Sequence, residues 1–443
     1  MMSAPLYRNP AIRVFPLDSD VRDEMVLCEI PHRDRAPTRY ALPAKLLTFL
    51  DCFDGTRETS DILRTIDPQE IGVPQTADLD RLVSELLVPR GFLLSSTDDG
   101  AVAQAPTSEP RSNRRSPLYL RIPLLRSRIL LPIVSVFRPM FRRSIAIPIL
   151  VLIAGSHLVF YASILPQYSL EGTGLRTDAT IQALLLVFLG GLIHEIGHAT
   201  AGACYGCRRL EIGCGLYLYL VVLYTDLSEA WRLPRRQRAV VDLAGIYFQA
   251  AFVALLPIIH AFTGWTAPLS CFLISDLLIA ASLNPFLRLD GYWLLSDAFG
   301  ILNLRTASLA FLHFIKARLT LRGDRRAQMP WSLSRRSMVV LGIYVVFGTG
   351  FFAYLTVVLA KRLAMTLIQT YPHVVRDFLG MFADRPGDSA HPWTLALDIA
   401  WRGLVVIWIS FIAFHMSRRL IRRLRQSFGV SRGLLSWSVR GGK

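Results

Sequence analysis

A short stretch in the middle of the chain carries side chains that can bind a metal ion and move a proton. Residues 194–198 read His-Glu-Ile-Gly-His, between an apolar run and a series of small residues. Positions four apart share one face of a helix, so His194 and His198 can hold one cation. Glu195 follows the first histidine, and its carboxylate can take a proton from a metal-bound water, whose pKa zinc lowers to about 7. The spacing therefore predicts a zinc site with hydrolytic chemistry.

These ionisable side chains lie in a segment that is otherwise apolar enough to span a bilayer. In a soluble helix, two histidines and a glutamate can form a polar patch that packs against other helices and binds nothing. Inside a membrane segment, ionisable groups are costly and rare, and they indicate a functional site. We therefore favour metal binding over a packing role for this cluster.

The composition indicates an integral membrane protein. Of the 443 residues, 52% are hydrophobic, and the mean hydropathy is +0.38. The formal charge is +16, but the basic residues stand beside the apolar runs, as the positive-inside rule expects of cytoplasmic anchors. We therefore expect the basic residues to interact with a lipid bilayer and not with nucleic acid.

The six cysteines are scattered along the chain and do not suggest a disulfide framework. For the C-x-x-C pair Cys204 and Cys207, packing thiols are favoured over a second metal site.

Residues 1–95 are expected to form a small soluble α+β domain. Their pattern predicts strands at 25–30 and 38–42, and helices at 43–53, 61–66 and 78–87, before an apolar segment at 92–94. This order of elements favours a winged-helix unit. The slight acidity of the domain argues against DNA binding.

The same domain resembles the PqqD-like peptide-binding domains. The positions that carry this resemblance are Phe53, Asp54, Gly55, Arg57, Ile62, Leu82, Leu86 and residues 91–93. Domains of this kind accompany enzymes that process ribosomally made peptides. The resemblance implies that a leader peptide is gripped along a strand edge.

Residues 96–140 are expected to be a linker followed by a basic segment at the membrane surface. Residues 96–117 are rich in Ser, Thr, Asp, Pro and Ala, and no Asp or Glu occurs between Pro110 and Leu170. Arginines flank the apolar runs 118–125 and 129–136. This pattern is typical of an interfacial segment attracted to anionic headgroups.

Apolar runs of about 20 residues predict a mainly α, polytopic membrane fold with six spans. The spans are placed at about 144–165, 178–205, 239–262, 268–287, 338–360 and 395–416. Arginine-rich stretches precede the first span and follow the second, fourth and sixth, which places both termini in the cytoplasm. We expect a bacterial inner-membrane protein with a core at 141–300 and two further spans within 301–443. The glycine-broken stretch 210–226 is expected to form a re-entrant β element rather than a seventh span.

The predicted topology brings another carboxylate to the depth of the two histidines. The fourth span runs in the same direction as the second and ends near Asn284, Pro285 and Asp290. A catalytic zinc site needs a third protein ligand and an open fourth position. Asp290 is the best candidate, because Pro285 can break the helix and Gly291 permits an unusual backbone turn. The alternative is that this aspartate only ends the span in water. Four other polar groups in the spans are rival ligands for which helix–helix hydrogen bonding is favoured: His157, Asp242, His260 and Asp276.

Together these residues resemble the site-2-protease-like intramembrane zinc metallopeptidases, and within them the bacterial peptide zinc metalloprotease branch. The resemblance covers about residues 140–300. It rests on residues 194–198 and on the stretch that holds Asn284, Pro285 and Asp290. Further positions also carry it: Tyr224, Thr225, Asp226, Ala230, Trp231, Ala244, Gly245 and Asp297. It implies zinc on His194, His198 and Asp290. It also implies Glu195 as general base and Asn284 near the substrate backbone or oxyanion. Family members often have N-x-x-P, whereas Asn284 directly precedes Pro285 here.

The sequence thus predicts a zinc metalloendopeptidase that cleaves a peptide or membrane-protein substrate near the cytoplasmic face. In this hypothesis the N-terminal domain presents the peptide, and a peptide exporter is a further candidate partner. The alternatives are a non-catalytic binding or export component with a structural zinc, and a metal-ion carrier. The intact Glu195 favours the enzyme, because a structural site needs no base.

Overall fold

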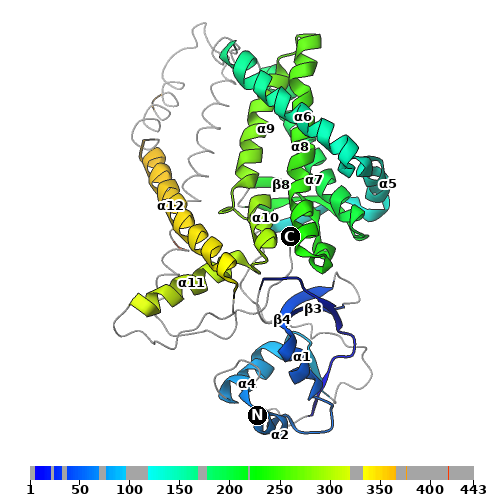
Figure 1. Cartoon of the computed structure of the whole chain (residues 1–443), viewed down its shortest axis with the longest axis vertical. Coiled ribbons are helices and arrows are strands. Elements are labelled where there is room, and N and C mark those ends of the chain that lie inside the picture. Colours follow the sequence, from blue (N-terminus) through cyan, green and yellow to red (C-terminus); the bar gives the residue numbers. More distant parts are fainter. Residues whose placement is uncertain are drawn as a thin grey trace. The chain divides into compact units, whose positions relative to one another are not determined.

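The described part of the chain is mainly helical, with three small antiparallel sheets. The computed structural model describes residues 5–20, 24–31, 37–68, 76–95, 118–167, 177–217, 220–319 and 333–365, and single helical positions at 376 and 418. The chain divides into two compact units, one of residues 1–341 with 434–443 and one of residues 342–433. Figure 1 labels the elements that carry the argument.

The N-terminal region contains two of the sheets. Strand β3 (Met25–Ile30) lies between β2 (Arg13–Pro16) and β4 (Thr38–Pro43), while β1 (Leu6–Arg8) pairs with β5 (Leu93–Ser95). The strands predicted at 25–30 and 38–42 are therefore confirmed. Strands β1 and β2 were not predicted, because each is short and its register depends on a distant partner.

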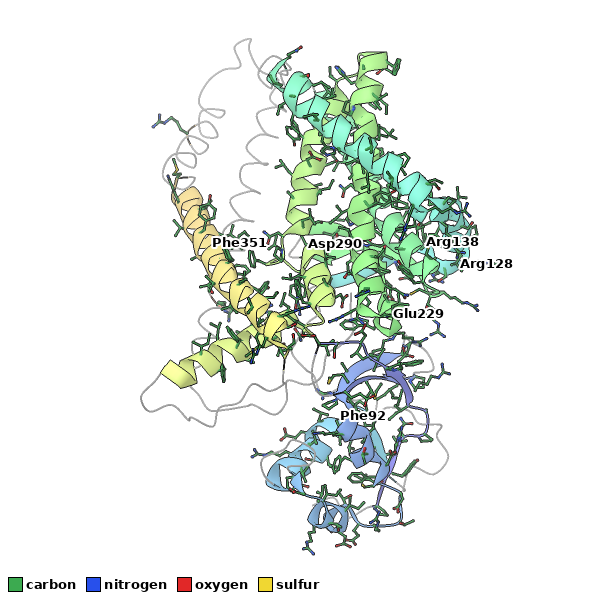
Figure 2. The ribbon with its side chains drawn as sticks, viewed as in Figure 1. Phe92, Arg128, Arg138, Glu229, Asp290 and Phe351 are labelled. Carbon is green, nitrogen blue, oxygen red and sulfur yellow. The ribbon has the colours of Figure 1, made fainter. Side chains whose placement is uncertain are left out.

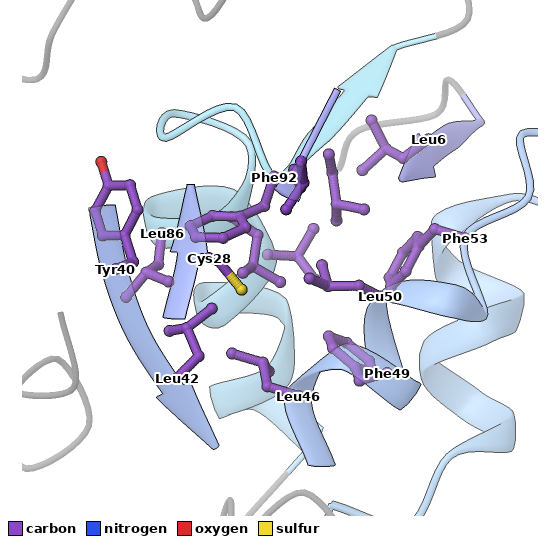
Figure 3. Close-up of a cluster of buried hydrophobic side chains, with 14 of the residues drawn as sticks. Leu6, Cys28, Tyr40, Leu42, Leu46, Phe49, Leu50, Phe53, Leu86 and Phe92 are labelled. Atoms are coloured by element: carbon purple, nitrogen blue, oxygen red, sulfur yellow. The ribbon is translucent and has the colours of Figure 1, made fainter. Parts of the chain in front are cut away.

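Short helices follow strand β4 in the expected order. They are α1 (Ala44–Asp51), α2 (Thr59–Thr65) and α4 (Thr76–Leu82), and α4 continues as the π-helical turn η1 (Val83–Leu87). In α1, Leu46, Phe49 and Leu50 share the buried face, which is the spacing of an amphipathic helix. Figure 3 shows this face meeting Leu6, Cys28 and Phe92 in one apolar core. The winged-helix assignment stays a prediction.

A buried carboxylate connects this region to the turn before helix α8 (Arg235–Thr263). Glu29 on β3 is 2% exposed, and its Oε1 accepts hydrogen bonds from Nε of Arg39 at 2.6 Å and from Nε of Arg232 at 3.1 Å. Arg232 ends the 3₁₀ helix η5 (Ser228–Arg232). Burial alone would raise the pKa of Glu29, but the hydrogen bonds from Arg232 and Arg39 outweigh it and hold the pKa below its ordinary value.

Within the described residues, four helices are long and apolar enough to cross a membrane. They are α6 (Arg143–Val159) with its continuation to Gln167, α7 (Thr177–Cys204), α8 (Arg235–Thr263) and α12 (Arg335–Met365). These helices match the first, second, third and fifth predicted spans. The fourth corresponds to α9 (Ala267–Leu283), an apolar helix somewhat shorter than the roughly 20 residues of a straight crossing. The sixth, at 395–416, lies outside the described residues.

The third sheet joins segments that the sequence places far apart. Strands β7 (Glu211–Tyr217) and β8 (Leu220–Asp226) form an antiparallel hairpin, so the β element expected at 210–226 is present. Strand β6 (Leu118–Arg126) pairs with β7, with register shifts around Pro123. Residues 118–125 form a strand of this sheet, which the sequence did not predict, and their expected position along the membrane surface stays a prediction. A partner so distant in sequence leaves no local pattern, and Pro123 lowers the strand signal.

The helix after β6 has a buried apolar face and an exposed apolar face. Helix α5 (Ser127–Phe137) buries Leu130 and Val134, four positions apart on one face. It leaves Ile129 and Val136 exposed, at 56% and 72%.

Candidate metal centre

Two neighbouring helices bring the main polar groups together. Helices α7, α8 and α9 pack against one another, and Figure 1 shows α7 and α8 running side by side. His194, Glu195 and His198 lie in the second half of α7, and all three are less than 10% exposed. The buried face of α8 that they meet carries Val241, Ala244 and Gln249 among others.

A break after α9 turns Asp290 toward the same place. Asn284 is extended, with ψ 113°, as expected of a residue that precedes proline, and α9 ends at Leu283. The predicted break at Pro285 is thus confirmed. Asp290 is the first residue of α10 (Asp290–Phe299), where Figure 2 labels it. Gly291 does not have the unusual backbone angle we expected. It is required because a Cβ there would lie 2.1 Å from the carbonyl oxygen of Leu283.

The three predicted ligands converge within hydrogen-bonding distance of one another. Oδ2 of Asp290 lies 2.9 Å from Nε2 of His194, and Oδ1 lies 3.3 Å from Nε2 of His198. The two Nε2 atoms are 3.1 Å apart. Donor atoms about 2.0–2.2 Å from a tetrahedral zinc ion are themselves separated by roughly 3.3–3.6 Å. The observed spacings lie close to that range.

Hydrogen bonds on the far side of each ring fix which nitrogen faces the centre. Nδ1 of His198 lies 2.7 Å from the carbonyl oxygen of Val241, which can only accept, so Nδ1 carries the hydrogen. Nδ1 of His194 is paired in the same way with Oε1 of Gln249, at 2.9 Å. In the neutral rings, both Nε2 lone pairs therefore point at the carboxylate of Asp290. Three electron-pair donors aimed at one point fit a cation, and the two histidines with one carboxylate suit zinc.

Gly245 on α8 leaves the room that this arrangement needs. A Cβ at this position would lie 2.4 Å from Nε2 of His198 and 2.6 Å from Nε2 of His194. Any larger residue would therefore occupy the space in front of both donor atoms. The two imidazoles can approach α8 only because this position has no side chain.

The hairpin β7–β8 supplies a partner for Glu195. Oγ1 of Thr225, near the end of β8, lies 2.7 Å from Oε2 of Glu195 and 3.0 Å from its carbonyl oxygen. Thr225 is 6% exposed, so this hydroxyl holds the carboxylate in an enclosed place beside the first histidine. Thr225, Gln249 and Gly245 were not assigned roles from the sequence, because their roles follow from contacts between separate elements.

The remaining candidates lie elsewhere or have other contacts. Oδ1 of Asn284 accepts a hydrogen bond from the amide of Phe286 at 2.9 Å, a local turn contact, so its substrate role stays a prediction. His157 pairs with Asp276 at 3.1 Å, and Nδ1 of His260 lies 2.8 Å from the carbonyl oxygen of Trp265. Among the described residues, the cluster of metal-binding groups consists of His194, His198 and Asp290.

Comparison with known proteins gives one informative match. The chain is 27% identical over 106 residues to the "Putative peptide zinc metalloprotease protein YydH" of Bacillus subtilis (strain 168). The match covers 24% of this chain and 42% of that protein, less than half the length of either. No family model and no solved structure matches the chain.

Proposed function

We propose that the protein is an intramembrane zinc metalloendopeptidase of the site-2-protease type, within the peptide zinc metalloprotease branch. The observation that carries this proposal is the convergence of His194, His198 and Asp290 with Glu195 beside them. A zinc ion held by these ligands supplies a Lewis acid that polarises a peptide carbonyl and acidifies water. The partial similarity to a protein named as a zinc metalloprotease supports the same chemistry.

The residues around the proposed zinc ion have separate roles in binding and in proton transfer. Val241 and Gln249 hold the two histidines in the tautomer that presents Nε2, and Asp290 supplies the negative charge of the ligand set. Glu195 acts as general base and passes its proton to the leaving amine, while Thr225 fixes the orientation of its carboxylate. Burial of the two histidines, Glu195 and Thr225 limits their contact with bulk water and strengthens their electrostatic interactions.

The surrounding parts of the chain suggest how a substrate reaches this site. The N-terminal region, proposed as a PqqD-like winged-helix domain over residues 1–95, binds the peptide from the cytoplasmic side. A linker and basic segment at 96–140, the core at 141–300 and a C-terminal membrane region at 301–443 complete the proposed organisation. The substrate is a peptide or membrane protein cleaved near the cytoplasmic face of a bacterial inner membrane, with Asn284 near its backbone.

Co-expression with candidate substrates tests this proposal. The candidates are short peptides encoded by neighbouring reading frames, and mass spectrometry detects cleavage by the wild type and by Glu195→Gln at matched zinc content. We expect cleavage only by the wild type. Equal cleavage by both proteins would show that the mechanism is wrong. Bound zinc with no cleavage of any candidate peptide would support the alternative of a non-catalytic binding or export component.

A further inference from the structure

Helix α10 carries a buried aspartate about two turns after the half-buried candidate ligand Asp290. This residue, Asp297, is 2% exposed, and its Oδ1 accepts a 2.8 Å hydrogen bond from Nε of Arg238. Arg238 lies in the first turns of α8, and its side chain is fully buried. The charges of Arg238 and Asp297 thus face each other in an enclosed place, which proteins tolerate only when such groups are paired.

The guanidinium of Arg238 satisfies two more acceptors from different parts of the chain. Its NH1 donates to the carbonyl oxygen of Leu233 at 2.9 Å, and its NH2 donates to the carbonyl oxygen of Asp18 at 3.0 Å. The planar fork of an arginine can make such a set of bonds, which the single ammonium of a lysine cannot reproduce. Arg238 therefore joins α10, the turn before α8 and the N-terminal region.

The far end of α10 is fixed by the same N-terminal segment. Gly300 ends the helix with φ 64°, and its carbonyl oxygen accepts a 3.0 Å hydrogen bond from the amide of Asp20. Asp297 lies in the last turn of α10, and Gly300 is the capping residue directly after it. That turn is consequently held against α8 and residues 18–20.

The same helix α8 orients all three candidate ligands. Val241 and Gln249 accept the hydrogen bonds that set the two imidazoles, and Arg238 holds the helix that begins with Asp290. A helix transmits a displacement along its axis, and Asp290 and Asp297 are separated by roughly 10 Å of that axis. Metal ligands must lie within about 0.2 Å of their ideal distances, so a small shift at Asp297 disturbs the site.

We propose that Arg238 and Asp297 are positioning residues for the metal centre. Their buried pair fixes α10 on α8 and thereby sets the carboxylate of Asp290 against the two histidines. This inference rests on the proposed metal site. Neither residue is one of the three candidate ligands, so the expected effect is on metal affinity and not on proton transfer.

Zinc affinity of the full-length protein in detergent tests the inference. Competition with a chelator gives the affinity for wild type, Asp297→Asn and Arg238→Lys, and thermal unfolding of the zinc-free proteins gives their stability. Asp297→Asn keeps the shape but removes the charge, and Arg238→Lys keeps the charge but loses the forked donors. Arg236→Lys is the matched control, because Arg236 is exposed in the same first turn of α8.

We expect zinc affinity to fall about tenfold or more in both buried variants, as it does when outer partners of metal ligands are lost, and to stay unchanged in Arg236→Lys. A purely structural pair would lower the unfolding temperature and leave zinc affinity unchanged well below that temperature. That result overturns the inference while the proposed function stands. If the wild type binds no zinc, both are overturned. Should Asp297→Asn not fold, the milder Arg238→Lys gives the same decision.

Discussion

The hydroxyl of Thr225 lies 2.7 Å from the carboxylate of Glu195, although one residue belongs to a β-hairpin and the other to a membrane-length helix. The same oxygen is 3.0 Å from the backbone carbonyl of Glu195, so its one hydrogen can serve either acceptor. The hairpin thereby limits the directions in which this carboxylate can point. A base that must reach a reacting proton depends on such orientation.

Replacing Thr225 by valine should lower kcat of peptide cleavage and leave zinc content unchanged. The variant keeps the shape of the side chain but removes the hydroxyl, and we expect a fall of about tenfold, or roughly 1.4 kcal/mol. Thr200→Val is the matched control, since the buried Thr200 donates its hydroxyl hydrogen to the carbonyl oxygen of Ile196 within its own helix. Equal kcat for Thr225→Val and wild type would contradict this role.

Gln249 should be needed for tight zinc binding. Gln249→Leu removes the acceptor for Nδ1 of His194, which frees the ring to adopt the other tautomer. We expect zinc affinity, measured by chelator competition, to fall about 10- to 100-fold. Gln249→Glu keeps an acceptor oxygen and should lose much less. If the leucine variant bound zinc as tightly as the wild type, the hydrogen bond would have no part in the site.

A methyl group at position 245 should abolish zinc binding. Gly245→Ala places its Cβ within 2.4 Å of Nε2 of His198, so the ring or the helix must move. Gly155→Ala provides the control, because Gly155 lies in the apolar helix α6 and a Cβ there meets no atom within 4 Å. Zinc content by elemental analysis should be lost in the first variant only. Full zinc content in Gly245→Ala would argue against the described packing of α7 on α8.

The buried Glu29 should make stability depend on pH. Its pKa is lowered in the folded protein from the ordinary 4.5, so its contribution is complete above that value and is lost as pH falls through the lower folded value. Glu29→Gln should destabilise the protein by about 1–3 kcal/mol at pH 7, and its unfolding temperature should approach that of the wild type in acid. Asp51→Asn in the exposed Arg8–Asp51 pair should change little. A difference between Glu29→Gln and wild type that does not shrink below pH 4.5 would contradict this reasoning.

The candidate metal ligands could be predicted from the sequence because their spacing and their positions within the apolar segments are visible there. His194 and His198 share a helix face by periodicity alone, and Asp290 could be matched to their depth from the order and direction of the spans. The helix break at Pro285 could also be predicted from the sequence, since proline restricts the backbone of the residue before it.

The groups that orient those ligands could not be found in this way. Gln249 reads as an ordinary polar residue of a long helix, and its role exists only once α8 packs on α7. Thr225 and Gly245 were among the positions that carry the family resemblance, but the sequence assigned them no chemical role. Arg238 looked like one more cytoplasmic anchor, yet it is buried against Asp297. Strand β6 was missed for the same reason, because its partner β7 lies far along the chain.

Zinc affinity of two aspartate variants tests the central claim most directly. Asp290 and Asp276 both lie near histidines, but only Asp290 is placed against His194 and His198, whereas Asp276 pairs with His157. We predict that the wild type and Asp276→Asn bind a single zinc ion per chain tightly, and that Asp290→Asn binds it far more weakly. Zinc held as tightly by Asp290→Asn as by the wild type would contradict the account.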